Sequence, residues 1–171
     1  LDLFEQVEGI CDICNQARDL RYDGPFYSVD EPDYMCPWCI ENGTAAEKFE
    51  GSFFDLGDIE GAVFHLQEDG EFYFSHNIAS AETEIIQFKT PSYSSWQQQV
   101  WLTHCLHPCK FITYATSENI KTIYAELATD IQQSCVDEDQ ILNHMHEDGW
   151  FKGYLFQCIQ CEKYRLHIDC S

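Results

Sequence analysis

Two short cysteine pairs near the start of the chain, Cys11-Asp12-Ile13-Cys14 and Cys36-Pro37-Trp38-Cys39, decide how this sequence folds. Two residues between the thiols let a tight turn bring both sulfur atoms to one centre, and 21 residues separate the pairs. Two such turns supply the four thiolates of a closed tetrahedral zinc site, with Zn–S bonds of about 2.3 Å. We therefore expect a structural zinc ion bound by Cys11, Cys14, Cys36 and Cys39.

Two other chemistries fit parts of the same pattern. Cys36-Pro37-Trp38-Cys39 alone is compatible with a thioredoxin-like redox pair, and four cysteines are compatible with an iron–sulfur cluster. A redox pair stands alone at the start of a helix, whereas here a second pair lies within reach. The pattern therefore favours zinc over both alternatives.

A second, looser set of cysteines lies in the C-terminal half, in His104-Cys105-Leu106-His107-Pro108-Cys109 and Cys158-Ile159-Gln160-Cys161. The strand-like residues on both sides of Cys158–Cys161 resemble a zinc-ribbon hairpin. We expect a second structural zinc ion bound by Cys105, Cys109, Cys158 and Cys161. His104 or His107 can replace one thiolate, because imidazole is an equally good ligand. The alternative is a set of free cysteines buried in a core.

Two cysteines remain outside these sets. We expect Cys135 to be a plain buried or half-exposed thiol, and Cys170 to be a spare ligand or to have no role. Neither has a His or Asp partner at a spacing that indicates a nucleophile.

Charge is the strongest bulk signal, with 30 acidic residues against 9 basic ones and a formal net charge of −21. This sign argues against nucleic acid as a partner, because a phosphate backbone requires a basic surface. It favours association with a basic protein. No apolar run reaches the roughly 18 residues of a membrane span, and the first residues do not resemble a signal peptide. We expect no membrane partner and a location in the bacterial cytoplasm, where thiols stay reduced.

Hydrophobic periodicity and capping signals predict a compact α+β fold of zinc-ribbon or knuckle type, with two four-cysteine zinc sites, short strands and about four helices. Helical segments are expected at 44–51, 77–88, 117–131 and 137–145, and another after a cap at Ser94 or Ser95 that carries Trp96 to Leu102. Strand-like segments are expected at 20–22, 25–29, 110–115, 153–157 and 163–168. We expect one domain over 1–171, with a knuckle pair at 9–42 and a helical part at 94–171 closed by the C-terminal ribbon.

Several literal runs resemble the CbrC-like family, which is linked to tolerance of colicins. They occur in the same order over nearly the whole chain: Tyr22-Asp-Gly-Pro-Phe-Tyr-Ser-Val-Asp30, Cys36-Pro-Trp-Cys39-Ile, Ala45-Ala-Glu-Lys-Phe49, Thr90-Pro91 through Trp96-Gln-Gln, Trp101-Leu-x-His104-Cys105, Gly153-Tyr-Leu-Phe-x-Cys158-x-x-Cys161 and Arg165-Leu166. The resemblance implies a bacterial intracellular protein with a tolerance phenotype and no assigned reaction. Members often place a small residue after the second and fourth knuckles, where this chain has Asn15 and Glu162.

We find no catalytic motif in the sequence, and four-thiolate sites leave no position for a metal-bound water. The sequence therefore favours a binding protein over an enzyme. The leading hypothesis is an immunity or tolerance factor that neutralises a basic, nuclease-type toxin by direct contact. Its contact residues are expected in two acidic clusters, Glu68, Asp69 and Glu71 or Asp137, Glu138 and Asp139, with Phe72, Tyr73 or Trp150 as anchors. The alternatives are a zinc-ribbon interaction module of a cellular complex and, third, a hydrolase or thiol oxidoreductase.

Overall fold

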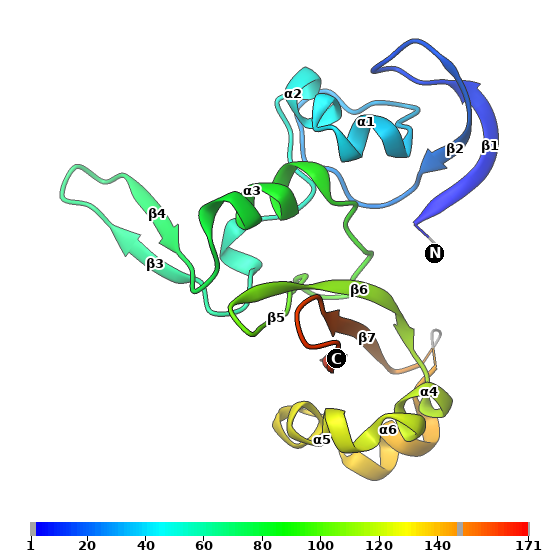
Figure 1. The fold of residues 1–171 in the computed structure, drawn as a ribbon, viewed down its shortest axis with the longest axis vertical. Coiled ribbons are helices and arrows are strands. Elements are labelled where there is room, and N and C mark those ends of the chain that lie inside the picture. Colours follow the sequence, from blue (N-terminus) through cyan, green and yellow to red (C-terminus); the bar gives the residue numbers. More distant parts are fainter. Residues whose placement is uncertain (1–2, 147–148, 171) are drawn as a thin grey trace. The chain divides into compact units, whose positions relative to one another are not determined.

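The computed structural model describes residues 3–146 and 149–170, and it divides into two compact units. The first unit comprises Leu1–Asp58 and Ala62–Ser94, and the second comprises Ile59–Gly61 and Ser95–Ser171. Figure 1 shows the elements of both units, and each unit contains one of the two groups of side chains that could hold a metal ion. The union of both units in a single domain stays a prediction.

The first unit begins with an antiparallel hairpin of β1 (Phe4–Ile10) and β2 (Ala17–Tyr22), which the Cys11–Cys14 turn connects. Three helices follow along the chain: α1 (Pro37–Glu41), α2 (Thr44–Phe49) and α3 (Ser80–Lys89). A short 3-10 helix, η1, spans Leu56–Asp58. The buried side chains of this unit include Ile40, Phe53, Phe54, Ile86 and Tyr93. These side chains form the buried interior of the first unit.

Most elements of this unit were predicted from the sequence. The expected strand at 20–22 lies within β2, and the helices expected at 44–51 and 77–88 are α2 and α3. The strand expected at 25–29 was wrong, because this segment makes only an isolated bridge between Tyr27 and Ser52. Pro25 cannot donate a backbone hydrogen bond, which fits the lack of a continuous ladder.

A second hairpin of the first unit consists of β3 (Val63–Leu66) and β4 (Phe72–Ser75), which pair with each other without a register shift. In the described part of the chain, neither strand pairs with any further strand. Figure 1 shows this ribbon extending away from α3. Phe74 anchors its base against Gly57, and the His76 ring lies 2.8 Å from the carbonyl oxygen of Leu56.

The second unit is a four-stranded antiparallel sheet in the order β5-β6-β7-β8. Its strands are β5 (Thr103–His104), β6 (His107–Ala115), β7 (Phe151–Cys158) and β8 (Tyr164–Cys170). The strands expected at 110–115, 153–157 and 163–168 are confirmed as parts of β6, β7 and β8. Each strand pairs with the next one along the chain; short turns join β5 to β6 and β7 to β8, whereas the connection from β6 to β7 contains the three helices described next.

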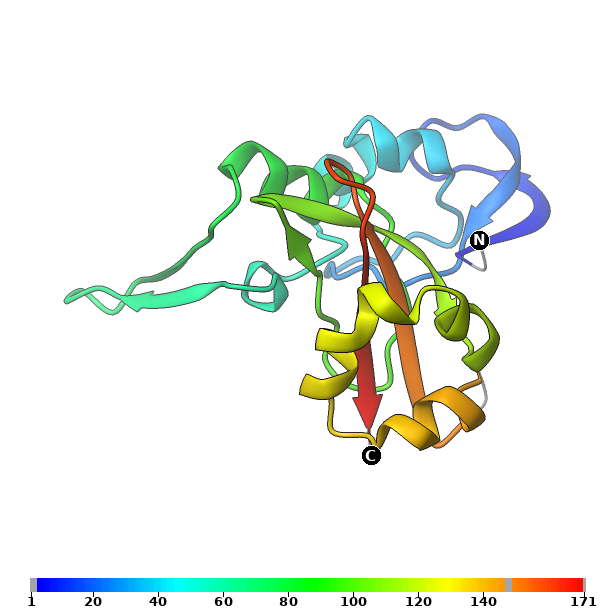
Figure 2. The same cartoon turned by 60° about the horizontal axis from the view of Figure 1, so that its bottom comes forward.

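Three helices cover the β7–β8 part of this sheet: α4 (Ser117–Thr122), α5 (Tyr124–Gln133) and α6 (Glu138–His144), as Figure 2 shows. Their buried faces pack on the sheet in one core, which contains Ala115, Ile120, Leu127, Ile131, Ile141, Met145, Leu155, Leu166 and Ile168. The helix expected at 117–131 is therefore present as two helices. It breaks at Ile123, whose backbone leaves the helical region at φ −123° and ψ 18°.

The helix expected after Ser94 or Ser95 was wrong, because residues 96–102 contain no helix. The carboxylate of Asp169 accepts hydrogen bonds from the backbone N–H groups of Trp96 and Gln97 and from the hydroxyl of Ser95. Trp101 is buried and its indole N–H donates to the carbonyl oxygen of Cys109 at 2.8 Å. These tertiary contacts hold the segment extended despite its helical spacing of apolar residues.

The described residues contain six α-helices, where about four were expected. None of these helices is both long enough and apolar enough to span a lipid bilayer.

Candidate metal centres

The first ligand group combines the end of the β1 strand with the start of α1. Cys11 and Cys14 lie in a tight turn in which the Cys11 N–H donates to the Gln16 carbonyl at 3.0 Å and the Asn15 N–H donates to the Cys11 carbonyl at 2.8 Å. Asn15 follows the second thiol with φ 56°, a left-handed conformation that asparagine tolerates. Cys36 precedes α1 and Cys39 lies within it, and Pro37 provides the favoured first residue of the helix.

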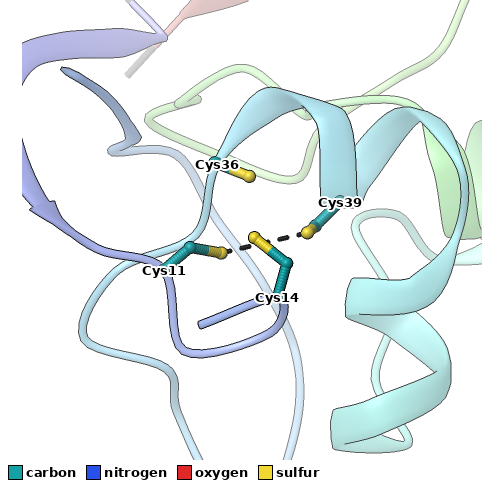
Figure 3. Close-up of side chains that lie close together, drawn as sticks. All are labelled: Cys11, Cys14, Cys36 and Cys39. Carbon is teal, nitrogen blue, oxygen red and sulfur yellow. Dashed lines mark hydrogen bonds between the residues drawn. The ribbon is translucent and has the colours of Figure 1, made fainter. Parts of the chain in front are cut away.

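The four sulfur atoms converge on one centre, as Figure 3 shows. All four lie within 4.8 Å of one another, and the Sγ atoms of Cys11 and Cys39 are 3.9 Å apart. Zn–S bonds of about 2.3 Å in a regular tetrahedron place sulfur atoms about 3.8 Å apart. The predicted set of Cys11, Cys14, Cys36 and Cys39 therefore fits a tetrahedral metal ion in both donor chemistry and spacing.

The surroundings of this group shift the pKa values of its thiols in different directions. Burial alone raises the pKa of Cys14, but hydrogen bonds, first from the Gln16 backbone, outweigh it and lower that pKa to about 7. Burial raises the pKa of Cys39 to about 12. The Arg18 guanidinium lies near the thiols and 4.5 Å above the Trp38 ring, where it offsets negative charge on the sulfurs. A bound metal ion supplies the remaining charge needed to hold four thiolates together.

The second ligand group joins two turns at one end of the β5-β6-β7-β8 sheet. The first is the two-residue connection from β5 to β6, in which Cys105 and Leu106 both have positive φ, 55° and 63°. The second is the Cys158–Cys161 turn between β7 and β8. Its backbone repeats the pattern of the first group: the Cys158 N–H donates to the Lys163 carbonyl at 2.8 Å, and the Glu162 N–H donates to the Cys158 carbonyl at 3.1 Å.

Glu162 occupies the left-handed position after the last thiol, with φ 62°, as Asn15 does in the first group. The N–H groups of Gln160 and Cys161 point at the Cys158 sulfur, with N···S distances of 3.4 and 3.5 Å. Burial raises the pKa of Cys158, yet these hydrogen bonds outweigh it and lower that pKa to about 6. The turn therefore has the geometry of a zinc knuckle despite its glutamate.

The structure brings His104, and not Cys109, together with the other three residues of the expected second set. His104, Cys105, Cys158 and Cys161 lie within 4.8 Å of one another, and the His104 Nδ1 is 3.2 Å from the Cys105 sulfur and 3.3 Å from the Cys161 sulfur. A tetrahedral zinc ion with one imidazole places nitrogen and sulfur about 3.6 Å apart. A histidine in place of one thiolate was the alternative left open by the sequence.

Cys109 lies outside this group although it pairs with Cys158 across β6 and β7. It is buried, and burial raises its pKa to about 12, which favours a neutral thiol in the core. His107 is also outside the group. Among the remaining cysteines, Cys135 is disulfide-bonded, so the expectation of a plain thiol was wrong; the side chain of Cys170 lies outside the described part of the structure.

The acidic residues expected to bind a partner lie at two places on the surface. Glu68, Asp69 and Glu71 are exposed at the turn between β3 and β4. Asp137, Glu138 and Asp139 are also exposed, but they have local roles at the start of α6: Asp137 caps the helix, and Glu138 accepts a hydrogen bond from the Tyr124 hydroxyl. The expected anchors Phe72, Tyr73 and Trp150 are exposed as well.

Two polar networks of the second unit, a buried one at Asp169 and a partly buried one at Arg165, were not anticipated from the sequence. Asp169 accepts hydrogen bonds from Ser95 at 2.6 Å and Tyr154 at 2.8 Å, besides the two backbone N–H groups described above. Arg165 forms ion pairs with Asp130 and Glu60, both at 2.9 Å. The sequence signal for them was the alternation of Arg165 and Asp169 with the apolar residues Leu166 and Ile168 in β8.

Comparison with known proteins places the chain in a family. The model of the "Uncharacterised protein family (UPF0167)" matches residues 2–170, and the chain therefore belongs to this family. UPF0167 protein PA1536 of Pseudomonas aeruginosa is 32% identical over 165 residues, which cover 93% of this chain and 84% of the relative. UPF0167 protein Mb2317 of Mycobacterium bovis and UPF0167 protein MT2352 of Mycobacterium tuberculosis are each 28% identical, over 93% of this chain and 81% of theirs. No solved structure matches the chain significantly.

Proposed function

We propose that this member of the UPF0167 family is an acidic binding protein, stabilised by two structural zinc ions, that associates with a basic protein. The observation that carries the proposal is the formal net charge of −21. Several of the nine cationic side chains are already engaged within the molecule. Arg165 pairs with Asp130 and Glu60, Arg21 pairs with Glu5, and Arg18 lies beside the first thiol group. The six lysines are the other cationic side chains, and they stand against 30 acidic residues.

The ligand groups support a structural role for the zinc ions. Each group supplies four donor atoms, which fill a tetrahedral zinc coordination shell and leave no position for a reactive water. Each group also lies in a unit with a small core, where metal binding contributes directly to folding stability. We accordingly assign the chain no reaction of its own.

For the partner, we propose a basic toxin of the nuclease type. Toxins that bind nucleic acid carry positive charge, and an acidic inhibitor associates with them rapidly through electrostatic steering. The resemblance to the CbrC-like proteins, which are linked to colicin tolerance, supports this class of partner. The chain is then an immunity or tolerance factor that blocks the toxin by direct contact.

Calorimetric titration of the zinc-loaded chain against each basic toxin domain encoded beside its gene tests this function. We expect binding to at least one such domain, and we expect the affinity to fall between about 50 mM and about 300 mM salt because counterions screen the attraction. A pore-forming toxin domain of low net charge is the control. Absence of binding to every basic domain, or an affinity that salt does not change, would contradict the proposal.

A further inference from the structure

The β3–β4 hairpin presents a continuous apolar face to solvent. Its cross-strand pairs Phe64–Phe74 and Leu66–Phe72 point to one side, because alternate residues of a strand face opposite sides of a sheet. Phe64, Leu66 and Phe72 remain 56%, 67% and 62% exposed. The rings of Phe64 and Phe72 stack at 5.6 Å, and Phe64 meets Phe74 edge to face at 5.8 Å. These four side chains, Phe64, Leu66, Phe72 and Phe74, are called the hairpin face below.

The hairpin also lacks the features that protect exposed strands. Its strands, Val63–Leu66 and Phe72–Ser75, contain no acidic residue, lysine, arginine or proline, and the pairing has no bulge. Natural proteins usually place charges, prolines or bulges on such edges to prevent uncontrolled pairing. A two-stranded ribbon is moreover only marginally stable in water. An unprotected ribbon with an apolar face is typical of a surface that another molecule covers.

The charge at the tip of the hairpin indicates which kind of molecule covers the hairpin face. Glu68, Asp69 and Glu71 are exposed at the tip of the hairpin, directly beyond Leu66 and Phe72. The Glu71 N–H donates to the Asp69 carboxylate at 3.1 Å, and the Gln67 N–H donates to the Glu71 carbonyl at 2.8 Å, so the turn is ordered by its own hydrogen bonds. These bonds hold the tip carboxylates next to the hairpin face.

Two other occupants conflict with this charge. A second copy of the chain would bring two sets of tip carboxylates together and carry its own net charge of −21. An anionic membrane surface would repel the tip. A protein that presents apolar side chains flanked by lysine or arginine can pack on the hairpin face and pair with the tip carboxylates.

We propose that the β3–β4 hairpin is the surface that holds the basic partner, with the hairpin face as its apolar centre and Glu68, Asp69 and Glu71 as its charged rim. This inference rests on the proposed function, and it selects the hairpin over the acidic start of α6. In the α6 cluster, Asp137 and Glu138 are engaged in a cap and a tyrosine contact, and the buried apolar side of the helix faces its own core.

Site-specific photo-crosslinking in the bacterium that encodes the protein tests this assignment. The photoreactive residue p-benzoylphenylalanine replaces Phe72 on the hairpin face, Asp139 on α6, or Val29 as a control that is 99% exposed. Crosslinked proteins are identified by mass spectrometry. Zinc content and circular dichroism of each purified variant verify that the chain is folded.

We expect the Phe72 position to crosslink a basic protein and the Val29 position not to do so. Reversal of the tip charges in the same chain (Glu68→Lys, Asp69→Lys and Glu71→Lys) should reduce that product about tenfold or more. A basic protein crosslinked from Asp139 and not from Phe72 would overturn the hairpin assignment and leave the proposed function standing. A second copy of the chain as the product at Phe72 would also overturn the assignment. No basic protein from either position above the Val29 control would overturn both.

Discussion

Single residues decide which side chains gather into the two candidate metal centres, and the sequence spacing predicts these side chains only in part. The described chain has five residues other than glycine with positive φ, and four of them, Asn15, Cys105, Leu106 and Glu162, lie in the turns of these centres. Such conformations cost about 1 kcal/mol or more each and persist where surrounding interactions enforce them. The left-handed turn at Cys105 and Leu106 carries Cys105 toward His104 and leaves Cys109 in the core.

Alanine substitutions test whether His104 or Cys109 is a ligand of the second centre. We expect Cys109→Ala to retain two zinc ions per chain, because the Cys109 thiol lies outside the ligand group. We expect His104→Ala to retain one, because it removes a donor atom from the second centre. Elemental analysis of the purified variants measures both. Loss of zinc from Cys109→Ala with full occupancy in His104→Ala would restore the four-thiolate set.

Asp169 is a residue whose charge stabilises the second unit. Its hydrogen bonds hold its pKa well below the usual range against the opposing effect of burial. We expect Asp169→Asn to lower the free energy of unfolding by about 2–3 kcal/mol at neutral pH, because a buried network loses its charged acceptor. Urea denaturation of the zinc-loaded proteins measures the difference.

The pH dependence of that difference gives a sharper test. A carboxylate with a depressed folded pKa contributes stability that is fully present above its unfolded pKa, about 3.9, and that is lost as pH falls toward the folded pKa. The gap between the native chain and Asp169→Asn should therefore be present at about pH 5 and shrink below about pH 4. A gap that is independent of pH would argue against a charged Asp169.

At the scale of elements, local signals predicted most of the secondary structure. Three signals could be read from the sequence: the end of α3 before Thr90-Pro91, the Asp137 cap of α6, and the strands on both sides of Cys158–Cys161. The segment 96–102 could not, because Asp169, about seventy residues away in the chain, provides its hydrogen-bond acceptor. The break at Ile123 was also invisible, because the apolar spacing continues through it. Local patterns contain no information about such distant partners.

Gly153 in β7 tests how tightly the second unit packs. A Cβ atom at this position would lie 2.8 Å from the Ala115 Cβ and 2.5 Å from the Met145 sulfur. We expect Gly153→Ala to destabilise the protein by about 1–3 kcal/mol through overpacking. The control is Gly70→Ala, where the added carbon meets nothing within 4 Å and only a φ of 89° opposes it. An equal or smaller effect at Gly153 in chemical denaturation would contradict this packing.

At the scale of the whole molecule, both units contain the same kind of candidate metal centre. Each contains a knuckle with the same backbone hydrogen bonds and a second pair of ligands from a different part of the chain. The sequence predicted the presence of both groups, because paired cysteines at short spacing are specific. With zinc bound, the first group has four thiolates and the second has three thiolates and a histidine. Seven lost protons and two zinc ions together change the formal charge from −21 to about −24. Bound zinc would therefore leave the chain strongly acidic.

The two centres should release zinc at different rates. Cys105 and Cys161 of the second group are exposed, whereas Cys11, Cys36 and Cys39 of the first are buried. We expect a chelator to remove zinc in two phases, the faster one from the second group, because solvent reaches its ligands directly. A colorimetric zinc indicator follows the release. The variants Cys158→Ser and Cys11→Ser assign the phases, and persistence of the fast phase in Cys158→Ser would contradict the assignment.

The central claim is that this chain binds two zinc ions through seven thiols and one imidazole. X-ray absorption spectroscopy of the protein, purified without added metal, tests it most directly. At the zinc edge we predict two zinc ions per chain bound mainly by sulfur, with an imidazole scattering signal that disappears in His104→Ala. Two zinc ions without an imidazole signal would indicate two four-thiolate sites and contradict the role of His104. A chain with no zinc, or with iron in place of zinc, would contradict the account as a whole.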